Sequence, residues 1–131
     1  MANYIDGFVF PIARKYLEEY KQVAQAVAEI WKEHGALEYH EYLGESLEEI
    51  EGIRSFPKFG NSKEGEIIIF GWVSFASKEE RNLANERVAG DPRMAGLVGP
   101  LTDPSKMIFD ASRMVYGGFE SFIQLNGGGT N

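Results

Sequence analysis

The chain has 131 residues, of which 44% are hydrophobic and 25% are charged, and its net charge is −7. This is the composition of an ordinary globular domain, and the acidic balance argues against nucleic-acid binding, which needs a basic face, and against anionic membrane surfaces. The sequence has no cysteine, which excludes disulfides, thiolate metal sites and a cysteine nucleophile.

A cytoplasmic address is the default expectation. No basic-then-apolar leader opens the sequence, and no apolar run approaches the roughly 18 residues of a membrane span. We expect one domain over residues 1–125, followed by a flexible Gly/Asn-rich tail over 126–131.

A strand and a long helix are predicted for the first 35 residues. Residues 3–10 are rich in aromatic and β-branched types, which predicts a strand, and Pro11 is expected to end it. Over residues 13–34 apolar side chains recur every three or four positions, which predicts an amphipathic helix that Gly35 terminates.

Residues 36–43 alternate and predict a second strand. Its two faces are different: Glu38, His40 and Tyr42 share one of them, and Tyr39 and Glu41 share the other with leucines. The charged stretch that follows is predicted to be a long excursion, with residues 55–59 as a candidate short edge strand.

The second half of the chain repeats the order strand, helix, strand. Residues 66–75 form an almost continuous apolar run, which predicts a strand buried on both faces. Ser77 and Glu80 match a capping box, which predicts a helix to about Ala89. A short helix is expected over 91–97 and the last strand over 113–125.

The order β-α-β, β-α-β is typical of the α+β class, in particular the ferredoxin-like βαββαβ fold with a four-stranded antiparallel sheet. Both helices would then cover one face of the sheet. The other face is too apolar for water, so we expect a second copy of the chain to pack on it, sheet against sheet, as a homodimeric α/β-barrel.

Four sequence blocks, in this order, resemble the DUF1428 family of uncharacterised bacterial proteins: YIDGFV (4–9), FGWVSFASKEERN (70–82), GDPRM (90–94) and RMVYGGFE (113–120). The similarity extends from Tyr4 to about Phe122. The resemblance implies membership of the dimeric α/β-barrel superfamily, which includes cofactor-free monooxygenases of aromatic substrates, but it implies no established activity.

The only histidines are His34 and His40. His34 is interpreted as a helix C-terminal residue. His40 shares its strand face with Glu38, so the two form either a proton-relay pair or a hydrogen-bonded pair at a dimer interface. Two histidines without a tight cluster of carboxylates make a metal site unfavourable, so none is predicted. No glycine-rich stretch has the spacing of a nucleotide-binding loop, so no cofactor is predicted either.

Three further polar residues are given structural roles. Asp6 is expected to be a buried, hydrogen-bonded carboxylate, because the third strand would separate it from His40 by nearly 10 Å. Asp91 and Arg93 are expected to cap and hold the turn before the short helix, with an anion-binding helix start as the alternative.

Gly117 and Gly118 lie side by side in the last strand. A β-bulge, close packing under a bulky ring such as Trp72 or Trp31, or room for a ligand would each explain them. The leading site hypothesis is an apolar pocket walled by Trp72, Tyr116 and Phe119, with Arg113 at its rim.

Two functions remain open. The first is a homodimer that binds, or transforms, a small organic molecule, with His40 and Tyr116 as catalytic candidates. The second is a non-enzymatic self-association or stress-related interaction module. A polar-lined pocket of about 300 Å³ that reaches His40 or Tyr116 would favour the first.

Overall fold

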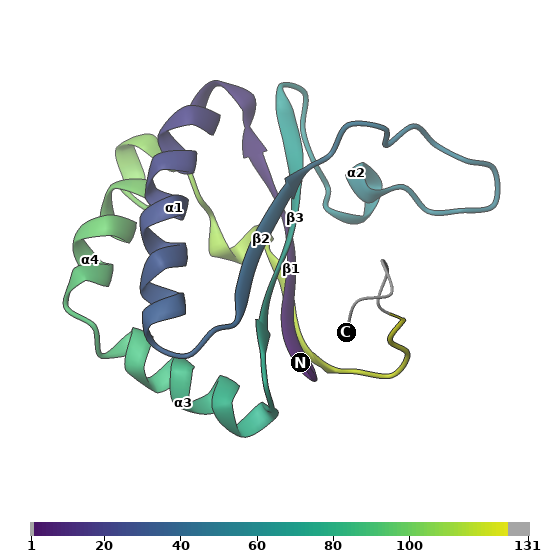
Figure 1. Cartoon of the computed structure of the whole chain (residues 1–131). Coiled ribbons are helices and arrows are strands. Elements are labelled where there is room, and N and C mark those ends of the chain that lie inside the picture. The colour runs from purple at the N-terminus through teal and green to yellow at the C-terminus, as the bar shows by residue number, and fades with distance from the viewer. Residues whose placement is uncertain (1, 126–131) are drawn as a thin grey trace.

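The computed structural model describes residues 2–125 and has a mixed α+β fold in two layers (Figure 1). One layer is a four-stranded sheet in the order β2-β3-β1-β4 with every neighbouring pair antiparallel. The strands are β1 (Tyr4–Ala13), β2 (Glu38–Leu43), β3 (Glu66–Phe75) and β4 (Val115–Glu120).

The second layer consists of helices on one side of the sheet, α1 (Leu17–Glu33), α3 (Lys78–Ala89) and α4 (Arg93–Val98) (Figure 1). The short helix α2 (Phe56–Phe59) and residues 121–125, which follow β4, lie on the opposite side. The described residues also form four 3₁₀ turns: Arg14–Tyr16, Gly99–Leu101, Pro104–Lys106 and Ala111–Arg113. Among the described residues, no helix is both long and apolar enough to cross a membrane.

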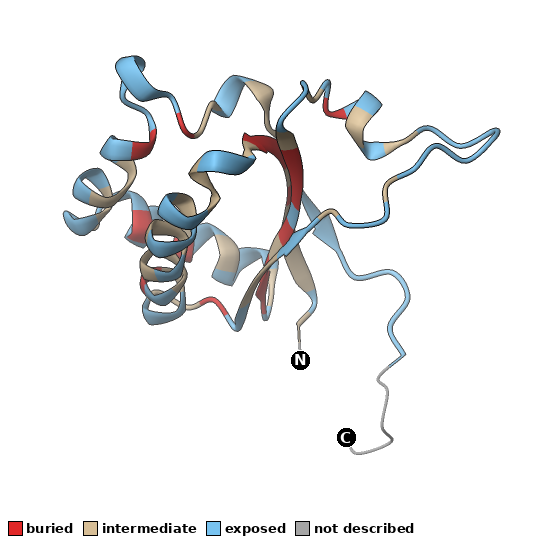
Figure 2. Ribbon diagram, turned by 90° about the horizontal axis from the view of Figure 1, so that it is seen from above, coloured by how far each residue is buried: buried red, intermediate tan, exposed pale blue. Residues whose placement is uncertain are grey.

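The core lies between the sheet and the helices, because alternate strand residues face that side. The buried side chains of β1 and β3 come from paired positions, such as Phe10 opposite Ile69 and Ile12 opposite Ile67. They pack against apolar side chains of α1, including Tyr20 and Trp31. Figure 2 shows the buried residues concentrated on these central strands.

Several predicted elements are confirmed. Strand β3 has the predicted bounds, and the Ser77 hydroxyl accepts a hydrogen bond from the Glu80 backbone N–H, as expected of the helix cap. The predicted helix over residues 13–34 begins later, at Leu17, after a 3₁₀ turn.

The prediction that Pro11 ends the first strand is wrong, because β1 continues to Ala13 and Pro11 pairs with Ile68 of β3. The pairing of β1 with β4 reaches only Val9, so the missing N–H of Pro11 costs no ladder hydrogen bond on that side.

The excursion after β2 contains a helix where an edge strand was a candidate. Ser55 caps α2 by accepting a hydrogen bond from the Lys58 backbone N–H, and Pro57 occupies its first turn, where a missing N–H is harmless. The last strand is shorter than predicted and ends at Glu120. The predicted tail, 126–131, lies outside the described residues.

Close packing, rather than a bulge, accounts for the paired glycines. The ladder between β1 and β4 runs without interruption from Tyr4 opposite Glu120 to Val9 opposite Val115, so β4 has no bulge. A Cβ at Gly118 would lie 3.0 Å from two ring carbons of Tyr4, whereas a Cβ at Gly117 would make only ordinary contact, 3.6 Å, with Phe119. The covering rings are therefore Tyr4 and Phe119, not the predicted tryptophans.

Candidate functional site

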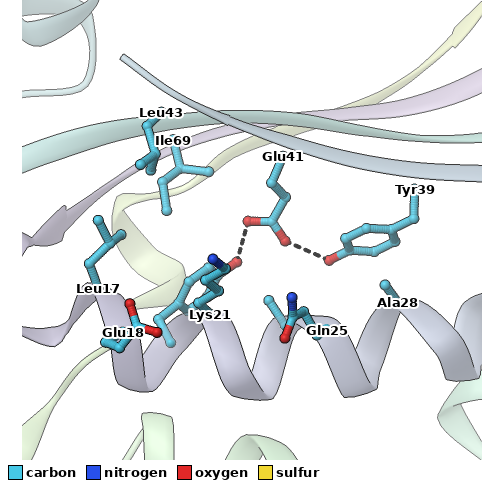
Figure 3. Close-up of a pocket in the computed structure, with 11 residues that line it drawn as sticks. Leu17, Glu18, Lys21, Gln25, Ala28, Tyr39, Glu41, Leu43 and Ile69 are labelled. Carbon is cyan, nitrogen blue, oxygen red and sulfur yellow. Dashed lines mark hydrogen bonds between the residues drawn. The ribbon is translucent and has the colours of Figure 1, made fainter. Parts of the chain in front are cut away.

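A cleft of about 460 Å³ opens between the N-terminal half of α1 and the edge strand β2 (Figure 3). Glu41 points from β2 towards the helix, and Lys21 and Gln25 lie on the helix below it. The lining residues come from the two elements and from one position of β3: Leu17, Glu18, Tyr20, Lys21, Ala24, Gln25, Ala28, Tyr39, Glu41, Leu43 and Ile69.

Two tyrosines hold the carboxylate of Glu41. The Tyr20 hydroxyl donates a hydrogen bond to Oε1 at 2.6 Å, and the Tyr39 hydroxyl donates one to Oε2 at 2.8 Å. Burial raises the pKa of Glu41, and the two hydroxyl donors oppose the shift. Burial and the neighbouring carboxylate raise the pKa of both tyrosines, so they remain protonated donors at neutral pH.

A second cavity of about 200 Å³ adjoins the cleft, and we call it the deeper cavity because core side chains such as Phe10 line it. Tyr20, Ala24 and Tyr39 line both spaces. The deeper cavity is mostly apolar, with walls from β1, α1 and the segment before β4. Its other lining residues are Asp6, Phe8, Phe10, Val23, Val27, Trp31, Val73, Val98, Leu101, Phe109, Met114 and Tyr116.

The deeper cavity has a polar group of side chains at Asp6 and Tyr116. Asp6 is only 2% exposed, and it accepts a hydrogen bond from Nη1 of Arg81 at 2.9 Å. Nη2 of Arg81 donates to the Tyr4 hydroxyl at 3.1 Å. Burial raises the pKa of Asp6, while Tyr116 and Arg81 lower it. The expected structural role of Asp6 thus has a defined partner on α3.

The predicted pocket of Trp72, Tyr116, Phe119 and Arg113 does not form in the subunit. Trp72 pairs with Gly7 and shares the helix-free face with Phe119, whereas Tyr116 pairs with Phe8 and lies on the helix-covered face. Residues 116 and 119 point to opposite sides because a strand without a bulge alternates strictly.

The other two sequence candidates, Arg113 and His40, have partners of their own. Arg113 makes a bidentate contact with Glu66, at 2.6 and 2.8 Å. His40 lies on the helix-free face, with its ring centroid 5.2 Å from that of Trp72 and its Nε2 3.5 Å from Glu38. The structure therefore brings His40 together with Glu38 and Trp72, but with neither Tyr116 nor Asp6.

The residues expected to hold the turn before α4 do so. Asp91 accepts hydrogen bonds from the backbone N–H and the guanidinium of Arg93, and its Oδ2 lies 2.8 Å from Nε2 of His34. The Arg93 contacts lower the pKa of Asp91. Arg93 also reaches Glu33 at 2.9 Å, so this cluster, His34 with Glu33, Asp91 and Arg93, joins the end of α1 to the start of α4.

Tyr20, Tyr39 and Glu41 were not among the site residues predicted from the sequence. The signal was present in the alternation of β2, where a charged residue lies among apolar ones on the face expected to be buried. In the described part of the chain, no three His, Asp or Glu side chains gather as a metal-binding group would require.

Comparison with known proteins identifies the family of the chain. The model of the family described as "Protein of unknown function (DUF1428)" matches residues 3–111. The chain belongs to this family. It is 34% identical over 121 residues to the uncharacterized protein YbaA of Escherichia coli K12, and equally to that of Shigella flexneri; each alignment covers 92% of this chain and 97% of the relative.

One solved structure is similar to this DUF1428 chain in its fold. It is a NIPSNAP family protein with unknown function from Agrobacterium tumefaciens, 15% identical, with a TM-score of 0.53 over 92% of this chain and 88% of that one.

Proposed function

We propose that this DUF1428 protein is a homodimer of ferredoxin-like subunits, each of which binds a small organic molecule in the helix-side cleft. The strand order β2-β3-β1-β4, with helices on one side, supports the ferredoxin-like assignment.

The helix-free face of the sheet supports the dimer. It carries Phe70 and Phe119, which are 43% and 59% exposed, beside Trp72. On the same side of the sheet, the segment around α2 and residues 121–125 project away from the helices (Figure 1), and they add exposed apolar residues such as Ile53 and Phe122. Exposed aromatic side chains gathered on one face of a sheet are unusual on a monomer and suit a second copy.

The cleft beside Glu41 is the observation that carries the binding proposal. It is a concave, largely apolar space with a few convergent polar groups, which is the usual form of a small-molecule site. The adjoining deeper cavity extends it to Tyr116, one of the two groups that the sequence hypothesis named.

An enzymatic form of the proposal assigns proton transfer to Glu41. A buried carboxyl whose pKa is raised is suited to accept a proton and return it during a reaction. Cofactor-free oxygenation of an aromatic compound, an activity found within the superfamily that the resemblance implies, is one candidate reaction, with Glu41 as the proton acceptor. A non-enzymatic module would use the helix-free face alone.

Light scattering and ligand screening test the two halves of the proposal. We expect twice the chain mass at micromolar concentration; a stable monomer would contradict the dimer. In a thermal-shift screen of small aromatic compounds, some should raise the melting temperature of the wild-type chain by mass action.

The screen has a matched pair of variants on one helix. Ala24→Phe fills the place where the cleft meets the deeper cavity and should abolish the stabilisation by ligands. Gln22→Phe adds the same ring to α1 at an exposed position outside both spaces and should leave it unchanged. Ligands that stabilise both variants equally would place the site elsewhere.

A further inference from the structure

We propose that the cleft beside Glu41 binds an organic cation, an amine whose ammonium group contacts the carboxylate and whose apolar body occupies the deeper cavity. This inference rests on the proposed function, that the helix-side cleft holds a small organic molecule, and it names the chemical class of that molecule.

The charges of the cleft favour a cation. Its titratable groups are Glu18, Tyr20 and Lys21 on α1 and Tyr39 and Glu41 on β2. With the tyrosines neutral, two carboxylates face one ammonium, so the cleft is negative. The ion pairs formed among the described residues include none of the three charged groups.

Glu41 lacks a countercharge. The hydroxyls of Tyr20 and Tyr39 give it one hydrogen bond at each oxygen but no positive charge. A carboxylate has about four acceptor sites, so each oxygen can accept a further donor. An ammonium group supplies both missing parts, the opposite charge and additional N–H donors.

The surroundings of Glu41 suit the rest of an amine. The rings of Tyr20 and Tyr39 border the carboxylate, and aromatic faces attract cations. The same two residues line the deeper cavity, where Phe10 and Trp31 offer apolar walls to a hydrocarbon or aromatic body. The carboxylate in that cavity, Asp6, is already paired with Arg81, so it does not compete for the ammonium group.

Three ligands with one body and different head groups test the inference: 3-phenylpropylamine, 3-phenylpropan-1-ol and 3-phenylpropanoate. Titrated into the wild-type protein at pH 7.5 by calorimetry, the amine should bind at least tenfold more tightly than the alcohol, and the acid should be the weakest. Equal binding of amine and alcohol would overturn the cation inference and leave the cleft site standing. If none of the three binds, the cation inference fails, and the thermal-shift screen decides separately whether the cleft site stands.

Variants of the cleft test whether the preference for amine over alcohol arises at Glu41. Glu41→Gln should reduce the preference for amine over alcohol to about twofold or less while the alcohol still binds, which also shows that the cleft remains folded. Lys21→Met removes the competing cation and should tighten amine binding several-fold. Its control is Lys32→Met, which changes an exposed lysine of α1 outside the cleft and should have no effect. Amine preference that survives in Glu41→Gln would contradict the inference.

Discussion

The contact between Gly118 and Tyr4 gives the sharpest stability prediction. An alanine at position 118 would place its Cβ 3.0 Å from two ring carbons of Tyr4, closer than carbon atoms pack. The ring cannot move freely, because its hydroxyl accepts a hydrogen bond from Nη2 of Arg81 at 3.1 Å and the guanidinium lies 4.9 Å from the ring centroid.

Two costs determine the magnitude for Gly118→Ala. Overpacking costs about 1–3 kcal/mol, and loss of a hydrogen bond to a charged donor costs up to roughly 1.5–3 kcal/mol when the ring is displaced. The lower entropy of alanine in the unfolded chain returns about 0.5 kcal/mol. We therefore expect a loss of about 2 kcal/mol, which for a chain of this size lowers the melting temperature by about 6 °C.

The neighbouring glycine is the matched control. At Gly117 the new Cβ makes only ordinary contact with Phe119, so Gly117→Ala should be neutral or slightly stabilising. Both variants are measured by urea unfolding at one protein concentration, because dissociation of a dimer would contribute to the transition. If Gly118→Ala and Gly117→Ala differ by less than about 0.5 kcal/mol, the packing explanation is wrong. In a Tyr4→Ala background the cost at position 118 should disappear.

Three further predictions concern the ionisable groups and the dimer. Burial raises the pKa of Glu41, so the contribution of this group to stability is present below its unfolded-state pKa of about 4.5 and is lost as pH rises through its folded pKa. In urea titrations, the free energy of unfolding of wild type relative to Glu41→Gln should therefore fall as pH rises between these two pKa values. Glu66 should give the opposite pH dependence of stability, because Arg113 lowers its pKa. Glu66→Gln should cost about 1–2 kcal/mol of unfolding free energy at pH 7 and progressively less as pH falls below 4.5. A cost that does not change with pH would refute the ion pair as its cause. Gly117→Val on the helix-free face should weaken the dimer by more than roughly 1 kcal/mol in dilution experiments followed by light scattering, and an unchanged dissociation constant would remove this position from the interface.

Periodicity was sufficient for the main helices and strands and for the faces of single strands, but not for the excursion after β2, where helix α2 replaces a candidate strand. The alternation of β2 correctly separated His40 from Tyr39 and Glu41, because side-chain direction in a strand has a period of two. The ends of elements were harder to predict. Pro11 was expected to end β1, but the extent of its pairing with β4 depends on tertiary structure.

The candidate site shows where local pattern is insufficient. The predicted pocket placed Tyr116 and Phe119 on one wall, which requires a bulge that the two glycines suggested but the register excludes. The cleft at Glu41 depends on how far α1 lies from β2. It also depends on the hydrogen bond from Tyr20 to Glu41, two residues that are 21 positions apart in the sequence. No spacing rule relates residues on two different elements, so this pair could be found only in three dimensions.

The ionic cluster between α1 and α4 has a dynamic consequence for the cleft. At its C-terminal end α1 is anchored through His34 and Glu33 to Asp91 and Arg93. Its first turn follows a 3₁₀ segment, has no side-chain cap and borders the cleft at Leu17. Glu19 in the first turn pairs with Lys106 at 2.9 Å, and Tyr20 in the next turn donates to Glu41. Both ends of the helix are therefore held, so admitting a guest wider than the cleft would require these two contacts to break.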